Sequence, residues 1–292
     1  MYFKITNAEE NHNGFQYVDG LNILTDEFIN DPDQSCCKGG FYFTDAANIF
    51  KFLDYGIYLR EITLPTDNLD FLMISDKSGD KWRTNMIIFG KRYDLFNVET
   101  FKYLIECGAD VHANDDFAFG YCTRIGQIDV VKYLVEAGAN IHANSEYALF
   151  WTAINGHLDV VKYLIEKGAD VHVNDDCALR GSAQNGHLDI IKVLVENGAN
   201  IHTHNDYALR SSAQYGYLDV VKYLIEKGAN VHAKNNYAFC LSAANGHLDV
   251  VKYLIESGAD VCANNNDPLI LSINNHHYNI AKYLVEKGAY IF

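Results

Sequence analysis

The sequence predicts a mainly α-helical solenoid of stacked helix pairs with a small α+β module at its N-terminal end. Three observations predict it. The dipeptide Gly-Ala recurs every 30 residues, at positions 108, 138, 168, 198, 228, 258 and 288. A longer unit, clearest at residues 206–235, surrounds each copy, and residues 1–80 contain no copy of it. A fixed period of this length is typical of arrays in which each copy packs mainly on its neighbours.

Each unit predicts two helices separated by a glycine. The segment 207–215 is short and carries several small side chains, which suits a brief first helix. Gly216 follows it, where the end of a helix needs a left-handed residue. The second helix has one apolar stripe at helical period, formed by Leu218, Val221, Leu224 and Ile225. Asp219 near its start and Lys227 at its end match the helix dipole. The polar, Asn-rich residues 229–235 predict a turn or a short hairpin.

Residues 1–80 predict a small α+β module. Gly39–Thr44 and the alternating Ile57–Leu64 are typical of strands, and Pro65 ends the second one. Asp45–Tyr55 lies between them and predicts a helix, because its apolar residues share one face.

The repeat array is predicted to span residues 81–292, with about seven copies. Its first copy is degenerate: Phe101–Asp110 matches well, but Ile87–Thr100 lacks the small residues of a first helix. A terminal copy has one face without a neighbour, so this departure marks either an end of the array or the place where the N-terminal module docks. The last copy is polar over Asn274–Asn279, before the final Ile291-Phe292, which indicates a closing cap.

The charge of the chain argues against several kinds of partner. The formal net charge is −15. Residues 1–80 hold 14 acidic against 5 basic residues, a net of −9, and residues 81–292 hold 24 against 18, a net of −6. Nucleic acids and anionic lipids bind clustered Lys and Arg, so we expect neither as a partner.

Cysteine usage and hydropathy predict the compartment. Seven cysteines without a C-x-x-C pair favour reduced thiols in an intracellular protein. The first residues lack the apolar run of a signal peptide, and no stretch of about 18 apolar residues could span a membrane. We therefore expect a soluble, intracellular protein.

The unit resembles the ankyrin repeat over about residues 87–292. Gly156–Val173 (GHLDVVKYLIEKGADVHV) and Gly246–Ala263 (GHLDVVKYLIESGADVCA) are similar to the core of that repeat. The family unit has about 33 residues and a T-P-L-H signature. This unit is shorter, the loss falls in the hairpin between Ala233 and Phe239, and only Asp267-Pro268 keeps the start of the signature. The short, Asn- and Tyr-rich unit resembles the ankyrin proteins of giant viruses of amoebae.

The resemblance implies a protein-interaction scaffold rather than an enzyme. It implies that the concave face of the array binds a protein, from a host if the chain is viral, without a cofactor and as a monomer. The location would then be the host cytoplasm, with the virion as the alternative. The positions where the family usually binds, together with aromatic and Arg residues on the same helices, give the candidate contact residues: Tyr121, Arg124, Phe150, Trp151, Ile154, Arg180, Gln184, Arg210, Gln214 and Tyr215.

Histidines recur at two positions of the unit and suggest a metal site at first sight. One set comprises His112, His142, His172, His202 and His232, and the other His157, His187 and His247. Packed helices lie roughly 8–10 Å apart, whereas shared zinc ligation needs nitrogens about 2 Å from one ion. The spacing favours structural hydrogen bonds and no metal, although histidines of the two sets could still meet.

Acidic residues recur in the turns. They are Asp115, Asp116, Glu146, Asp175, Asp176 and Asp206. Lining one edge of the solenoid, they would steer a basic partner; the simpler interpretation is solubility and helix capping, with Asp176 and Asp206 as caps of their own helices.

The alternative function is an enzyme, or a ubiquitin-ligase adaptor, with its activity in residues 1–80 and the repeats as substrate selector. Arg60 and Glu61 on a predicted strand, His12 and Cys36-Cys37 are the candidate groups, but no catalytic motif surrounds them. A deep pocket around Arg60 and Glu61 would favour this alternative. A virion or assembly component is a third hypothesis.

Overall fold

The computed structural model describes residues 1–34 and 38–290, without the side chains of residues 144–146 and 265. Cys36, Cys37, Ile291 and Phe292 lie outside the described residues. The chain forms two compact units. The first comprises Met1–Thr123 and Gln127–Ala143, and the second comprises Arg124–Gly126 and the residues from Asn144 onward. Each unit is described by itself.

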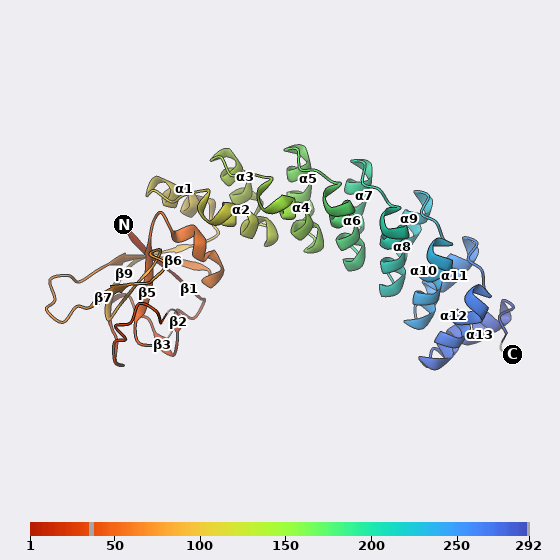
Figure 1. Cartoon of the computed structure of the whole chain (residues 1–292), viewed down its shortest axis with the longest axis horizontal. Coiled ribbons are helices and arrows are strands. Elements are labelled where there is room, and N and C mark those ends of the chain that lie inside the picture. The colour runs from red at the N-terminus through yellow and green to blue at the C-terminus, as the bar shows by residue number, and fades with distance from the viewer. Residues whose placement is uncertain (35–37, 291–292) are drawn as a thin grey trace. The chain divides into compact units, whose positions relative to one another are not determined.

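The first unit begins with a seven-stranded antiparallel sheet (Figure 1). Its spatial order is β4-β9-β6-β1-β5-β8-β7, and a separate hairpin pairs β2 with β3. The strands are β1 (Tyr2–Thr6), β2 (Asn11–His12), β3 (Phe15–Gln16), β4 (Gly20–Ile23), β5 (Phe41–Asp45), β6 (Tyr58–Thr63), β7 (Met73–Ser75), β8 (Trp82–Thr84) and β9 (Met86–Asp94). One face of the sheet holds an aromatic core, with Tyr17, Phe41, Phe43 and Phe89 buried together.

The predicted strands Gly39–Thr44 and Ile57–Leu64 are confirmed as β5 and β6. The helix expected over Asp45–Tyr55 is a shorter 3₁₀ helix, η1 (Ile49–Tyr55), with a kink at Phe52. The difference has a local cause. Asp45 belongs to β5, and its carboxylate accepts hydrogen bonds from the backbone and side-chain amides of Asn48, which makes a turn before η1 can begin.

The segment Ile87–Thr100, predicted to be the degenerate start of the first repeat, forms no separate first helix. Met86–Asp94 is strand β9, paired with both β4 and β6. The alternation of Met86 and Ile88 with Ile87 and Phe89 puts successive side chains on opposite faces of the sheet. The predicted boundary near residue 80 therefore falls between β7 and β8, two strands of one sheet.

The sheet module packs on the first repeat helix, α1 (Val98–Glu106). Phe50 of η1 stacks on Phe101 of α1 with ring centroids 5.2 Å apart, and both side chains are fully buried. The hydroxyls of Tyr93 and Tyr103 both donate to Oε1 of Glu61, at 2.5 Å. Within the first unit, the module thus covers Phe101 and Tyr103 of α1.

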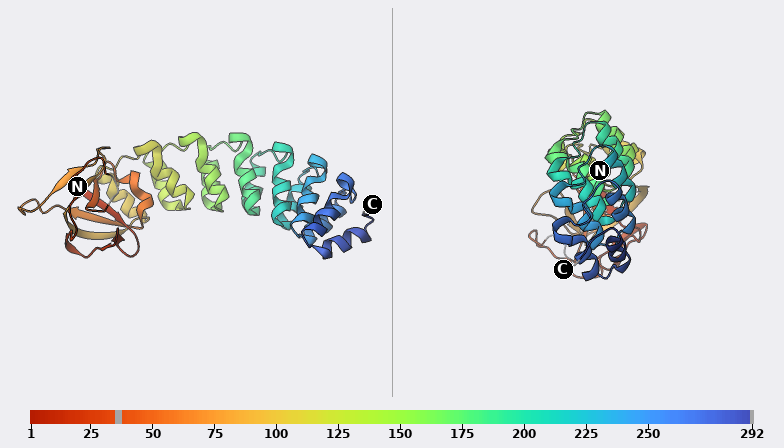
Figure 2. Two further views of the ribbon diagram at one scale, coloured as in Figure 1. Left: turned by 60° about the horizontal axis from the view of Figure 1, so that its bottom comes forward. Right: turned by 90° about the vertical axis from the view of Figure 1, so that its right-hand side faces the viewer.

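The remaining helices form pairs. In the first unit they are α2 (Ala113–Arg124) and α3 (Ile128–Glu136); Arg124 itself is grouped with the second unit. In the second unit the pairs stand side by side, as the left view of Figure 2 shows. First helices pack on first helices, and second helices on second helices. These pairs are α4 (Ala143–Ile154) with α5 (Leu158–Glu166), α6 (Val173–Asn185) with α7 (Leu188–Glu196), α8 (Thr203–Tyr215) with α9 (Leu218–Glu226), α10 (Ala233–Ala244) with α11 (Leu248–Glu256), and α12 (Ala263–Asn274) with α13 (Tyr278–Glu286).

The second helices are confirmed, and their predicted apolar stripe in part: Leu218 and Ile225 are only half-buried. In α9, Val220, Val221 and Leu224 are buried, Asp219 lies in the first turn and Lys227 follows the last. The left-handed glycine before it is confirmed as well, because Gly216 ends α8 with φ of 79°.

The predicted turn is present at the start of the first helices: the N–H of Ala233 donates to the carbonyl of Asn230 at 3.0 Å. Just inside the bounds of these helices, however, the backbone is left-handed. Three consecutive residues adopt left-handed backbone angles, for example Lys234, Asn235 and Asn236 with φ of 51°, 59° and 57°. The same geometry occurs at residues 114–116, 174–176 and 204–206. Asn and Asp tolerate this conformation better than most residues, since their short polar side chains bond locally. The Asn-rich composition of the shortened segment therefore follows from its backbone.

Candidate functional site

One set of histidines caps the first helix of the preceding repeat. In the second unit, the ring Nε2 of His187 donates to the carbonyl of Ile154 at 2.8 Å, and that of His247 to the carbonyl of Gln214 at 2.9 Å. His157 and His277 make the same bond to Arg124 and Ala244. Helix ends leave carbonyls without intrahelical partners, and these rings supply the missing donors.

The other set of histidines binds the left-handed turns. The Nδ1 atoms of His172 and His202 lie 3.0 and 2.9 Å from Oδ1 of Asp176 and Asp206. His112 and His232 make the equivalent contacts with Asp116 and Asn236. These contacts confirm the predicted structural hydrogen bonding for the histidines of both sets that are named above. Over the residues that the structure describes, no three His, Cys, Asp or Glu side chains gather as a metal site would require.

The turn carboxylates join one repeat to the next. Oδ1 of Asp176 accepts the backbone N–H of Asn200, and Oδ1 of Asp206 that of Asn230, each at 3.0 Å. Both carboxylates are buried, with 3% and 5% of the residue exposed. The expectation that they cap their own helices is wrong, because the left-handed turn aims the carboxylate at the following repeat. Asp115 and Asp175 remain exposed, and the side chain of Glu146 lies outside the described residues.

Two of the candidate contact residues, Arg180 and Arg210, are engaged within the fold. The guanidinium of Arg210 donates to the carbonyls of Asn205 and His204 at 2.9 and 2.7 Å, and Arg180 does the same one repeat earlier. Tyr207 lies between them, with its ring centroid 5.9 Å from Arg180 and 5.6 Å from Arg210. Only 9% of Arg210 is exposed. These arginines satisfy the carbonyls of the left-handed turns, so little of Arg210 can reach a partner.

Helix α4 brings three candidates together. Phe150 contacts Trp151 edge-on, with centroids 5.2 Å apart. Ile154 and Phe150 lie over Gly181 of the next first helix, where a Cβ would come within 2.5 Å of Ile154. The two apolar side chains therefore fill a space between helices. Trp151 does not, and 44% of it is exposed.

The remaining candidates differ in exposure. Tyr121 stacks between Phe96 and Phe117 in the first unit, so it serves packing there. In the second unit, Arg124 and Gln184 are exposed, Gln214 is half-buried, and 45% of Tyr215 is exposed. The sequence analysis missed Tyr147 and Tyr237, which are 45% and 39% exposed. Their signal was the Tyr that recurs at the start of the first helices.

In the sheet module, Arg60 and Glu61 do not converge. Successive strand residues face opposite sides of a sheet. Arg60 donates to both carboxylate oxygens of Glu10 at 2.6 Å and pairs with Asp19 at 2.8 Å, whereas Glu61 faces Tyr103 of α1. Hydrogen bonding to Arg60 lowers the pKa of Glu10 against the opposing effect of burial. The ion-paired groups border an open hollow of about 610 Å³, which Glu10, Asp19, Arg60, Lys91 and Arg92 line. Glu61 does not line it, so Arg60 and Glu61 do not share the pocket that would favour the enzyme alternative.

Five of the cysteines lie within the described residues, and all five are free thiols: Cys107, Cys122, Cys177, Cys240 and Cys262. Burial raises the pKa of the Cys240 thiol to about 11, which keeps it protonated. None of the helices in the described part of the chain combines the length and apolar character that crossing a membrane requires.

Comparison with known proteins identifies the repeat and its relatives. A protein of Acanthamoeba polyphaga mimivirus, provisionally named an ankyrin repeat protein, is 48% identical over 126 residues, which are 43% of this chain and 62% of the relative. An uncharacterised protein of the same virus is 50% identical over 116 residues, or 40% of this chain and 83% of the relative. A further provisionally named ankyrin repeat protein of that virus is 48% identical over 116 residues, only 35% of its own length.

The sequence profile of ankyrin repeats matches this chain three times, at residues 92–175, 174–235 and 209–292. These matches cover more than half of the 292 residues. The chain belongs to the ankyrin-repeat family.

Proposed function

We propose that this chain is a protein-interaction scaffold, and that its partner contacts the exposed aromatic residues of the first helices in the second unit. One observation carries the proposal. Four large aromatic side chains on these helices remain 39–45% exposed: Tyr147, Trp151, Tyr215 and Tyr237. The apolar residues around them pack against neighbouring helices, whereas a large part of each of these four side chains stays exposed to solvent.

The chemistry of these positions suits a protein partner. Trp, Tyr and Arg supply most of the binding energy at protein interfaces. The exposed candidates Arg124 and Gln184 provide polar contacts beside the aromatic residues, and Ile154 and Phe150 provide an apolar support. Arg180, Arg210 and Tyr121 would act indirectly, by holding turns and helices in place.

The finer parts of the function follow from the relatives. Since these belong to a virus of amoebae, we propose an amoebal protein as the partner, binding in the host cytoplasm to a monomeric scaffold. The sheet module would serve as a folded cap for the first repeat, because it covers α1 through Phe50 and Glu61. This proposal assigns no catalytic step to the chain.

A paired affinity experiment tests the proposal. The full chain, the double variant Trp151→Ala with Tyr215→Ala, and the control Tyr278→Ala would each be used to capture proteins from an amoeba extract. Tyr278 is 63% exposed but lies on α13, a second helix. We expect the captured partner to fall at least tenfold with the double variant and to stay within twofold with the control.

The fold of each variant is checked by circular dichroism before capture. Equal recovery of the same partner by the full chain and the double variant would show that the first-helix aromatic residues do not form the binding surface. Loss with Tyr278→Ala alone would place the surface on the second helices instead.

A further inference from the structure

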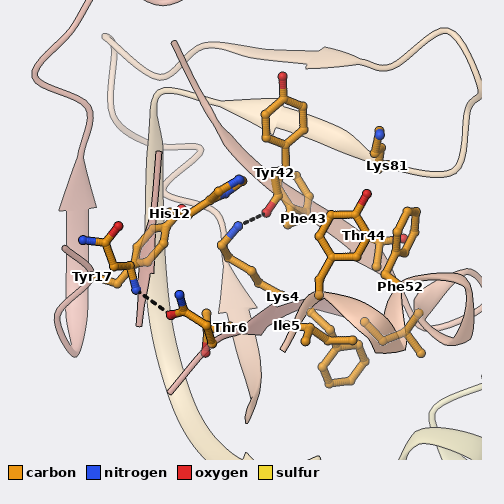
Figure 3. Close-up of a pocket in the computed structure, with 15 residues that line it drawn as sticks. Lys4, Ile5, Thr6, His12, Tyr17, Tyr42, Phe43, Thr44, Phe52 and Lys81 are labelled. Carbon is orange, nitrogen blue, oxygen red and sulfur yellow. Dashed lines mark hydrogen bonds between the residues drawn. The ribbon is translucent and has the colours of Figure 1, made fainter. Parts of the chain in front are cut away.

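The sheet module contains a cavity that neither the ion pair nor the repeat contacts use. Its volume is about 170 Å³. Residues of β1, β2, β5 and η1 line it, together with Tyr17 and Lys81, and Figure 3 shows them converging on one space. All of these residues belong to the first unit.

The polar groups of the cavity are cationic or neutral. Lys4, Lys81 and His12 line it, and none of its described lining residues is Asp or Glu. This is unexpected in a region of net charge −9. The buried Lys4 donates its ammonium to the carbonyl of Tyr42 at 2.8 Å (Figure 3). The ammonium of Lys81 pairs with the carboxylate of Asp76 at 3.9 Å, and Asp76 does not line the cavity.

The environment of His12 also bears on which charge the cavity can hold. Burial, and secondarily the charge of Lys4, lower the pKa of His12 to about 4. The ring is therefore neutral near pH 7, and it can donate or accept one hydrogen bond there. Of the two causes, only the smaller one, the positive charge of Lys4, favours an anion in the same space; burial disfavours any unpaired charge.

The other walls are apolar and aromatic. Phe3, Phe43, Ile49, Phe52 and Tyr55 face the cavity. The ammonium of Lys81 lies 5.8 and 5.9 Å from the ring centroids of Tyr42 and Phe52, so these rings flank the charge. A cavity of about 150 Å³ accepts one benzene molecule. The space therefore suits a single six-membered ring with a small charged substituent.

We propose that this cavity binds a small aromatic carboxylate, with its ring against Phe43 and Phe52 and its carboxylate in the field of Lys81 and Lys4. Desolvated aromatic walls and a few placed polar groups are the usual composition of small-molecule sites. The proposal is independent of the protein-binding surface, which lies on the first helices.

Helix η1 connects the cavity with the first repeat. Ile49, Phe52 and Tyr55 line the cavity, while Phe50 on the same helix stacks on Phe101 of α1. A ligand that binds only the folded module raises its stability in proportion to the logarithm of its concentration. Binding thus has a second readout, a rise in the melting temperature of the first unit.

Benzoate is the probe, and the full chain is titrated by calorimetry and by NMR of backbone amides. Benzyl alcohol, of similar shape but without charge, is the matched ligand. We expect benzoate to bind at least tenfold more tightly than benzyl alcohol, and to shift the amides of β1 and β5. The variant Lys81→Met should weaken benzoate at least tenfold. Lys77→Met removes the same charge from an exposed side chain that does not line the cavity, and should change affinity less than twofold.

Several results would overturn the proposal. The first is that the full chain does not bind benzoate. The second is that it binds benzoate and benzyl alcohol equally well, and the third is that a folded Lys81→Met variant binds benzoate as tightly as the unaltered chain. The comparison of the two ligands uses the unaltered chain, so it decides the question even where Lys81→Met fails to fold.

Discussion

The sheet module and the repeat array use buried polar groups in different ways. In the array, each bond is copied: turn side chains accept a backbone N–H 24 residues later, and histidine rings reach a carbonyl 33 residues earlier. In the module, each bond occurs once, as between Arg60 and Glu10, 50 residues apart. Copied bonds spread stability over many equivalent contacts, whereas the module depends on single ones.

This comparison predicts its largest effect where a repeated contact leaves no space. Gly216 combines a left-handed backbone with a Cβ position 2.4 Å from the ring of His247. Gly216→Ala should lower the free energy of unfolding by about 3 kcal/mol, from backbone strain and displacement of the ring. Gly228→Ala has the same kind of backbone but open space, and should cost about 1 kcal/mol. Urea unfolding measures both; equal losses would mean that His247 moves aside freely.

A single contact in the module should have the next largest effect. Glu10→Gln removes the charge paired with the buried Arg60, whose exposed fraction is 4%. Breaking such a pair costs about 3–5 kcal/mol when both groups are fully buried. Asp19 still pairs with Arg60, so we expect about 2 kcal/mol. The exposed neighbour variant Glu9→Gln should change stability by less than about 0.5 kcal/mol, and a similar loss in both variants would contradict the assignment.

The bond that the Asp206 carboxylate makes to the next repeat can be tested by substituting Asn, the residue that takes the same role at position 236. Asp206→Ala leaves the N–H of Asn230 without its acceptor, which should cost about 1–2 kcal/mol. Asp206→Asn should cost less than about 0.5 kcal/mol, because Asn236 already accepts the equivalent N–H of Asp260. Chemical denaturation of the two variants distinguishes a lost acceptor from a lost charge. If Asn proves as damaging as Ala, the charge itself is required.

The last effect should appear as a pH dependence of the module. The pKa of His12 is lowered to about 4, so the unfolded chain binds a proton between pH 6.5 and 4 that the folded chain does not. Folding stability should therefore fall as the pH falls through this window, at no more than about 1.4 kcal/mol per pH unit. His12→Gln should flatten this part of the curve. The contribution of Glu10, whose pKa is lowered, is lost only at more acidic pH. An unchanged slope in His12→Gln would exclude His12 as the source.

The sequence predicted the repeated part of the fold best, because the copies of the repeat can be compared with one another. The stripe of Leu218, Val221 and Leu224 and the glycine at 216 recur at one step, so comparing the copies identifies the helices and their ends. The module offers no second copy. Its strand β9 was assigned to the repeat array because Phe101–Asp110, a few residues after it, matches the repeat so well.

The candidate site was predicted less completely, for a geometric reason. Arg180 and Arg210 have the composition of interface residues, but the left-handed turns expose carbonyls within reach of their side chains. The turns themselves could not be foreseen, since Asn-rich segments also form ordinary turns. Trp151 and Tyr215 are exposed as predicted for contact residues, since neither side chain is buried in the packing between helices.

The bond from a turn side chain to the N–H 24 residues later links a unit only to the one after it. Since Asp and Asn both serve as the acceptor, this bond needs no matched change when one unit follows another. Duplicating or deleting one stretch of 30 residues would regenerate every such bond at the new junction. As far as this bond is concerned, the number of copies can therefore change in a single genetic step.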